Sequence, residues 1–129
     1  MKTNVETPEA PLPKTSPHSQ AIIANGFLFT QGSICLTTEG KLLEGTVEEQ
    51  VHQIMKNLET ILKAGGTSFD NVVKSTIYLT DMSLYGKVNE IYGSHFTAPY
   101  PARETVCVQA LPLGAQVEIS MIAITQPTP

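Results

Sequence analysis

Apolar residues recur at two different spacings along the chain, and the change of spacing separates helices from strands. Between Val47 and Leu62 they repeat every three or four residues, which is typical of a helix with one buried face. Thr46 and Glu49 have the spacing of a capping box, and the pair Gly65-Gly66 is a common stop signal. The pattern predicts a helix that begins after Thr46 and ends at these glycines.

Several other stretches have the composition of strands. Two short apolar runs, at about residues 19–24 and 27–33, are separated by Asn25-Gly26, the strongest short signal for a β-hairpin. Residues 71–80 are rich in β-branched side chains and alternate between two faces, one of which carries Val73, Ser75, Ile77 and Leu79. We expect a strand in each of these three stretches.

The second half of the chain predicts one more helix and two more strands. Asp81 or Ser83 can cap a helix that ends before Pro99. β-rich runs follow at residues 103–110 and 116–125, and the connection 111–114 is short enough for antiparallel neighbours. The order ββαβαββ predicts an α+β fold, a mixed sheet with two helices packed on one face.

The chain has the size of a single domain over residues 1–129. Prolines recur near its start, at positions 8, 11, 13 and 17. Because proline has a fixed φ angle and lacks an amide proton, this composition disfavours a helix. We expect residues 1–17 to form an extended N-terminal arm that lies against the domain.

The last predicted strand has apolar side chains on both of its faces. One face carries Val117, Ile119, Met121 and Ala123, and the other carries Ile122 and Ile124. Two helices can cover only one face of such a sheet, so the other face would expose a large apolar patch. We therefore expect a closed homo-oligomer in which another subunit covers that face.

Charge and composition narrow the possible partners. Lys and Arg number 8 against 12 Asp and Glu, and the net charge of -4 disfavours a nucleic-acid partner because the surface repels phosphates. No stretch approaches the roughly 20 apolar residues of a membrane span, and the first residues lack a signal-peptide pattern. We expect a cytosolic protein without a membrane partner.

Motifs for cofactors and metals are not found in the sequence. The glycines lack the spacing of a phosphate-binding loop, so no cofactor is expected. His18, His52 and His95 are scattered without the spacing of metal ligands, so no metal is expected either. Cys35 and Cys107 form no close pair and are expected to be free, buried thiols.

Two charged residues stand out as candidates for chemistry. Arg103 is the single arginine of the chain and follows the rigid segment 99–102, and its guanidinium can bind a carboxylate through two parallel hydrogen bonds. Glu118 interrupts an apolar strand. Burial raises the pKa of a carboxyl group and a nearby arginine lowers it, and a carboxyl group in this setting is suited to orient or deprotonate a water. In a hairpin of the last two strands it would face Cys107, close to Arg103. The alternative for Arg103 is a surface salt bridge with Glu104 or another acid. The alternative for Glu118 is a structural ion pair or an acid that faces the edge of the sheet.

The sequence resembles the RidA family of reactive-intermediate deaminases, also called YjgF-type proteins. Residues 16–21, Ser-Pro-His-Ser-Gln-Ala, are similar to the opening pattern of that family. The resemblance runs over nearly the whole chain, through residues 30–34, 73–81 and 88–92. It is most specific where Pro101-Ala102-Arg103 is followed by Val117-Glu118-Ile119.

This resemblance implies a cofactor-independent hydrolase that converts 2-imino and enamino acids into 2-keto acids and ammonia. It also implies a chorismate-mutase-like homotrimer with its sites between subunits. Arg103 would bind the substrate carboxylate, and Glu118, with the backbone carbonyl near Thr105, would position the water. Asn89 would support the cleft.

The chain departs from the family pattern at three positions expected to touch the cleft. His18, Gln31 and Thr105 stand where the family usually has Tyr, Ser and Cys. The departures keep a second interpretation open, a noncatalytic module that binds small carboxylates such as 2-keto acids. A third, an endoribonuclease or translation inhibitor, is disfavoured by the acidic charge.

Overall fold

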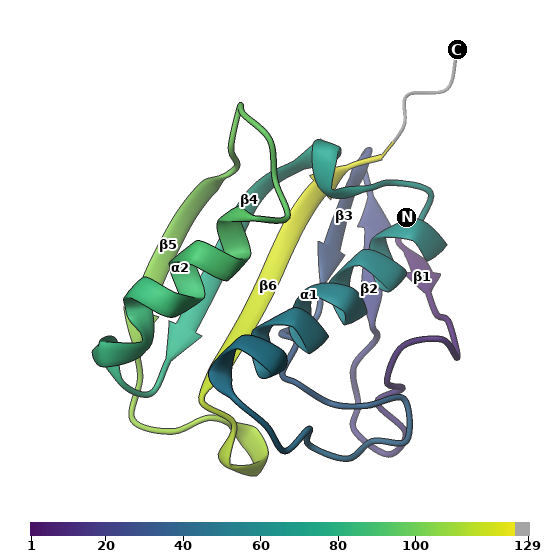
Figure 1. The fold of residues 1–129 in the computed structure, drawn as a ribbon. Coiled ribbons are helices and arrows are strands. Elements are labelled where there is room, and N and C mark those ends of the chain that lie inside the picture. Colours follow the sequence, from purple (N-terminus) through teal and green to yellow (C-terminus); the bar gives the residue numbers. More distant parts are fainter. Residues whose placement is uncertain (126–129) are drawn as a thin grey trace.

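A computed structural model describes residues 1–125 of the chain as a six-stranded mixed sheet with two helices on one face (Figure 1). The order of the strands across the sheet is β1-β2-β3-β6-β4-β5. The elements are β1 (Thr3–Val5), β2 (Ala21–Ala24), β3 (Phe27–Thr30), α1 (Val47–Ala64), β4 (Val72–Leu79), α2 (Tyr85–Gly93), β5 (Ala102–Cys107) and β6 (Val117–Ile124). The predicted α+β class and the placement of both helices on one face are confirmed.

Helix α1 has the cap that the sequence predicts. The hydroxyl of Thr46 accepts a hydrogen bond from the Glu49 amide at 3.1 Å, and Oε1 of Glu49 accepts one from the Thr46 amide at 2.9 Å. Gly65 ends the helix, and a side chain there would collide with Leu28. The predicted apolar face of α1 is buried against the sheet. It consists of Val51, Ile54, Met55, Leu58, Ile61 and Leu62. Local sequence signals therefore define this helix completely.

The hairpin β2–β3 also follows from local signals. Asn25 and Gly26 both have positive φ angles, 50° and 81°, as a two-residue hairpin turn requires. In β4, by contrast, the predicted alternation holds only in part. The register against β6 shifts between Val72 and Lys74, so Val72 is buried and Val73 is exposed. Such a bulge exchanges the two faces of a strand within one residue.

The prediction that the last two strands pair with each other is wrong. β4 lies between them, parallel to β5 and antiparallel to β6, and its Leu79 is opposite both Cys107 and Val117. β6 has one fully apolar, buried face and carries Ile122 and Ile124 on the other, and it therefore gains most from a central position. β5 carries exposed residues and forms the edge of the sheet. Helix α2 connects β4 to β5, and parallel strands need such a crossover connection.

The N-terminal arm is tied to the domain by one buried side chain. Gln20 is only 1% exposed; its Oε1 accepts the Thr7 amide proton at 2.7 Å, and its Nε2 donates to the carbonyl oxygens of Thr7, Ala10 and Pro11. The arm also contributes β1, which adds an antiparallel strand to the edge of β2. Sequence reasoning missed both features.

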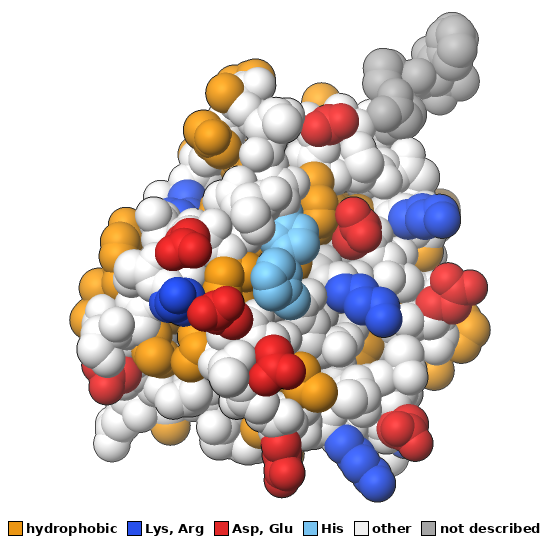
Figure 2. All heavy atoms as spheres, in the orientation of Figure 1, with side chains coloured by type: hydrophobic (Ala, Val, Ile, Leu, Met, Phe, Trp, Pro, Cys, Tyr) orange, Lys and Arg blue, Asp and Glu red, His pale blue; other side chains and the backbone are white. Residues whose placement is uncertain are grey.

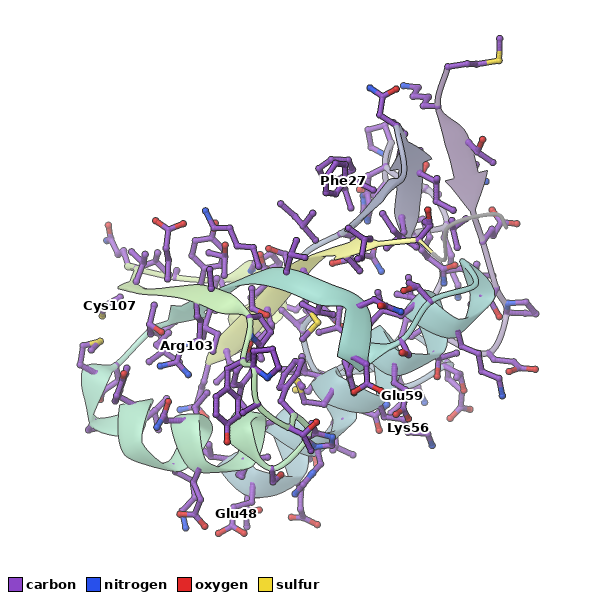
Figure 3. All side chains as sticks on the ribbon, turned by 90° about the horizontal axis from the view of Figure 1, so that it is seen from above. Phe27, Glu48, Lys56, Glu59, Arg103 and Cys107 are labelled. Carbon is purple, nitrogen blue, oxygen red and sulfur yellow. The ribbon has the colours of Figure 1, made fainter. Side chains whose placement is uncertain are left out.

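The two faces of the sheet differ strongly. The face below the helices is a closed core, while the opposite face exposes apolar side chains, among them Phe27, Phe29, Val73, Val106 and Ile124. Figure 3 shows Phe27 on that open face, away from both helices. Cys35 is buried and free as predicted, but Cys107 is exposed, because β5 is an edge strand.

No helix among the described residues is long and apolar enough to cross a membrane. The cytosolic location stays a prediction from the sequence.

Candidate functional site

Arg103 lies on β5 and points toward α2, on the helix side of the sheet (Figure 3). One terminal nitrogen donates to Oδ1 of Asn89 at 2.6 Å, and the other donates to the hydroxyl oxygen of Tyr85 at 3.0 Å. The guanidinium carbon lies 5.7 Å and 5.3 Å from the ring centres of Tyr85 and Tyr92. Neutral oxygens and two aromatic rings therefore hold the cation in place.

The interpretation of Arg103 as half of a surface ion pair does not hold. Glu104 pairs instead with Lys74, at 2.7 Å, and within residues 1–125 no carboxylate forms a salt bridge with Arg103. The half-buried guanidinium therefore keeps an unneutralised positive charge. That is the electrostatic condition for binding an anion.

A cleft of about 560 Å³ opens beside Arg103. We call it the arginine cleft; it is lined by Asn89, Glu90, Tyr92, Gly93, Tyr100, Pro101 and Arg103. Its floor is fixed by the Tyr92 hydroxyl, which donates to the buried Ser75 hydroxyl at 2.8 Å. Burial raises the pKa of Tyr92, so its phenol stays neutral beside the cation.

Glu118 lies on β6 opposite Tyr78 and faces the open side of the sheet. Its carboxyl group is half-buried, and this burial raises its pKa. The carboxylate packs against the backbone of Gly32, where any Cβ atom would overlap Oε2 of Glu118. Gly32 is therefore part of the seat of this carboxyl group.

His18 and Gln31 lie beside Glu118 and contact each other. Nε2 of His18 donates to Oε1 of Gln31 at 2.8 Å, and the Ser16 hydroxyl lies 2.8 Å from Nδ1 of the same ring. Two cavities of about 410 Å³ each share His18, Gln31, Gly32 and Glu118. We call this region the glutamate cleft.

Thr105 follows Arg103 by two positions on β5 and faces the same side of the sheet. Its hydroxyl oxygen is buried and has no hydrogen-bond partner among the described residues. A buried hydroxyl without a partner is costly, and an incoming ligand or water would relieve that cost.

The predicted residues thus form two groups rather than one. The structure brings Arg103 together with Asn89, and His18 with Gln31 and Glu118. The expectation that a single chain places Glu118 across from Cys107 and near Arg103 is wrong. On β4, Tyr78 pairs with Glu118 and Ser75 pairs with Arg103. Ser75 and Tyr78 are three residues apart, and residues an odd number apart on a strand point to opposite faces of the sheet.

Sequence reasoning missed Tyr85 and Tyr92 as partners of Arg103. A signal for them was present, because Tyr85, Asn89 and Tyr92 are spaced by four and three residues and so share one face of α2. Ser16 was also missed as the partner of His18. No local pattern identifies that contact.

Comparison with known proteins places this geometry in a family. The family described as Endoribonuclease L-PSP matches residues 7–125. A RutC family protein from Aquifex aeolicus is 48% identical over 123 residues, covering 93% of this chain and 97% of the relative. The mouse 2-iminobutanoate/2-iminopropanoate deaminase is 43% identical over 124 residues, covering 95% of this chain and 91% of the relative.

Solved structures agree with the sequence matches. The structure of TdcF from E. coli with bound serine superposes with a TM-score of 0.88 at 29% identity, covering 96% of this chain and 99% of that chain. The family match over residues 7–125 includes both clefts and strands β2 to β6. On these grounds the chain belongs to the Endoribonuclease L-PSP family, the group that includes the YjgF and RidA proteins.

Proposed function

We propose that this protein hydrolyses 2-imino acids and their enamine tautomers to 2-keto acids and ammonia. The observation that carries the proposal is the unpaired Arg103 guanidinium in the arginine cleft, held ready by Asn89 and Tyr85. A small imino acid offers the planar carboxylate that such a cation binds. The deaminase activity named for the mouse relative supports this substrate class, as does the serine bound to TdcF, which also carries a carboxylate.

The complete site is proposed to form between subunits of a homotrimer. Arg103 and Glu118 lie on opposite faces of one sheet, so a substrate that touches both needs Arg103 from one chain and Glu118 from its neighbour. The exposed apolar face around Phe27 and Phe29 supports such packing. A heterologous contact repeated around a three-fold axis closes into a ring.

In the proposed reaction, Arg103 binds the carboxylate and Glu118 handles protons. A water molecule adds to the imine carbon, the C=N electron pair moves to nitrogen, and Glu118 takes the proton that water releases. With the iminium form of the substrate this addition gives a carbinolamine, and Glu118 returns the proton to its nitrogen. The C–N bond then breaks with its electron pair on nitrogen and ammonia leaves. As the carbonyl forms, the hydroxyl proton of the carbinolamine passes to Glu118, which releases it to solvent. The raised pKa of Glu118 suits it both to take up and to release a proton, because a group whose pKa lies closer to the working pH exchanges protons more readily in both directions.

The other cleft residues would orient substrate and water. The backbone carbonyl near Thr105 would position the water, and Asn89 would support the cleft through its hydrogen bond with Arg103. His18 and Gln31 would contact the remainder of the substrate beside Glu118. No step requires a cofactor, because an iminium carbon is already electrophilic.

The direct test is the rate of imine hydrolysis in a coupled assay, with a threonine dehydratase supplying 2-aminocrotonate. Arg103→Ala should lower kcat/KM on the order of 10²-fold or more, because the charge pair between the guanidinium and the substrate carboxylate is lost. Arg103→Lys should recover little, since lysine lacks the planar fork. Lys87→Ala is the matched control, because Lys87 is an exposed cation of α2 paired with Glu48. Wild-type turnover by Arg103→Ala would refute the proposal.

A noncatalytic carboxylate-binding module is the second candidate. The hydrogen bond between His18 and Gln31 favours it, because it uses side-chain groups that otherwise face the substrate. Calorimetry decides between the two functions. Binding of 2-ketobutyrate that depends on Arg103, in a protein that never accelerates imine hydrolysis, would establish the binding module.

A further inference from the structure

Two histidines that are distant in sequence meet on the outer face of the helix layer. His52 belongs to α1, and His95 follows the end of α2. Nδ1 of His52 lies 3.2 Å from Nε2 of His95. Figure 2 shows histidine side chains together on the helix-covered side, over the region between the two helices. This is the side of the sheet opposite Glu118 and the exposed apolar face.

The position of the pair is fixed by packing around it. The ring of His95 lies edge-on against Phe69, with ring centres 5.9 Å apart, and Phe69 in turn packs against Phe96 at 5.2 Å. The helices are also joined by the salt bridge between Lys87 and Glu48, at 3.1 Å. The two imidazoles are therefore held at this separation by the fold, and a ligand does not have to assemble them.

The contact between the rings brings one nitrogen of each imidazole to the same point between α1 and the segment after α2. A neutral imidazole has a free electron pair on one nitrogen, which is the form that binds a metal ion. Glu59 adds a negative charge near the ring of His95, and such a charge favours a bound cation.

We propose that His52 and His95 form a binding site for a divalent late transition-metal ion of the Zn²⁺, Ni²⁺ and Cu²⁺ class. With metal–nitrogen bonds of about 2.0–2.1 Å, nitrogens at this separation subtend an angle of roughly 100–105° at the ion, close to the tetrahedral value. The hydrogen bond between the rings is replaced by two coordinate bonds. The ring that donated its proton loses it from this nitrogen and takes one up on its other nitrogen, so both imidazoles stay neutral.

The remaining coordination positions belong to water. Within residues 1–125 no group of three His, Cys, Asp or Glu side chains is placed to hold a metal, so the site has two protein ligands and stays open. An ion bound here would connect α1 to the segment after α2. It would stabilise the packing of the helix layer in the folded state only.

Titration calorimetry of the full chain with ZnCl₂, NiCl₂ and CuCl₂ tests the proposal. We expect one ion per chain, with Cu²⁺ bound most tightly, as the general affinity order of divalent metals requires. His52→Gln and His95→Gln should each weaken binding at least about tenfold, since the loss of even an indirect partner of a metal ligand costs that much. Circular dichroism checks that both variants are folded.

His18→Gln is the matched control, because it removes the third histidine of the chain. His18 forms hydrogen bonds with Ser16 and Gln31 and is not part of the His52–His95 pair. The His18→Gln variant should keep wild-type affinity, and the melting temperature of this variant and of the wild type should rise with added Zn²⁺. The proposal is overturned if the wild type binds no better than the His52→Gln/His95→Gln double variant. It is also overturned if His18→Gln is the change that abolishes binding. The measurements do not depend on deaminase activity.

Discussion

The arginine cleft and the glutamate cleft are built in opposite ways. In the first, one helix supplies Tyr85, Asn89 and Tyr92 to hold Arg103, and the cation is fully positioned inside a single chain. In the second, Glu118 sits on the open face of the sheet beside exposed apolar residues. Its carboxyl group contacts the backbone of Gly32 and has a raised pKa.

This difference separates substrate binding from proton transfer. The arginine cleft is preorganised for a carboxylate before anything binds, whereas the glutamate cleft holds an acid whose charged form is disfavoured by burial. A chain that keeps these functions on opposite faces requires assembly to combine them. The following changes test the contrast, beginning with the largest effect.

Glu118→Gln should have the largest effect on catalysis. It removes the proposed proton acceptor but preserves shape, so kcat should fall by about 10²–10⁴-fold while KM changes little. Steady-state kinetics with 2-iminobutanoate measures both parameters. An unchanged kcat would exclude Glu118 from proton transfer.

The same variant should gain stability where Glu118 is ionised. Because the folded protein raises the pKa of this group, the stability it contributes is present below the unfolded pKa and is lost as pH rises through the folded value. Glu118→Gln should therefore match the wild type at acidic pH and exceed it near neutral pH. Urea unfolding at several pH values measures the difference, and a variant less stable at neutral pH would contradict it.

Mixing two inactive variants tests whether the clefts combine between chains. Arg103→Ala and Glu118→Gln chains, unfolded and refolded together, should regain roughly a quarter of wild-type activity, the statistical fraction of restored sites in a randomly mixed closed ring. Each variant refolded alone is the control. No recovery in mixed oligomers would place both residues of a site in one chain.

Gly32→Ala should disturb only the glutamate cleft. The new methyl group displaces the Glu118 carboxylate, and misplacement by about 1 Å can cost on the order of 10²-fold in rate. Gly86→Ala in α2 is the matched control, since a methyl group there meets nothing within 4 Å. If both variants keep full kcat, the contact between Gly32 and the Glu118 carboxylate has no role in catalysis.

Tyr85→Phe should give the smallest effect and confine it to the arginine cleft. It removes one of the two hydrogen-bond acceptors of Arg103 but keeps the ring, so KM should rise about 2–10-fold. The kcat value should stay near that of the wild type. A variant with normal KM would show that Asn89 alone positions the guanidinium.

Local signals predicted more of the fold than of the site. The capping box at Thr46, the stop at Gly65 and the turn at Asn25-Gly26 depend on neighbours within a few residues, and each was found as expected. The pairing of β5 with β6 was predicted from a short connection and was wrong. β4 lies between them, because the largely apolar β6 gains more from a central position than the exposed β5 does.

The candidate residues followed from their chemistry, but their arrangement did not. The single arginine and an acid within an apolar strand are visible in the sequence, and the structure gives both an unusual environment. The face that Arg103 or Glu118 occupies depends on how β5 and β6 each pair with β4, because a shift of one residue in the pairing turns a side chain to the other face. The contact of His52 with His95 spans 43 residues and has no local signal.

By itself the sequence determined the α+β class, the ends of α1, the β2–β3 turn and the identity of Arg103 and Glu118 as candidates, because periodicity, caps and turns act over short distances. Only the tertiary structure decided that β4 separates β5 from β6, that Gln20 holds the arm, and that Arg103 and Glu118 lie on opposite faces. These outcomes depend on which surfaces are buried when distant segments pack, and short-range spacing carries no information about that choice.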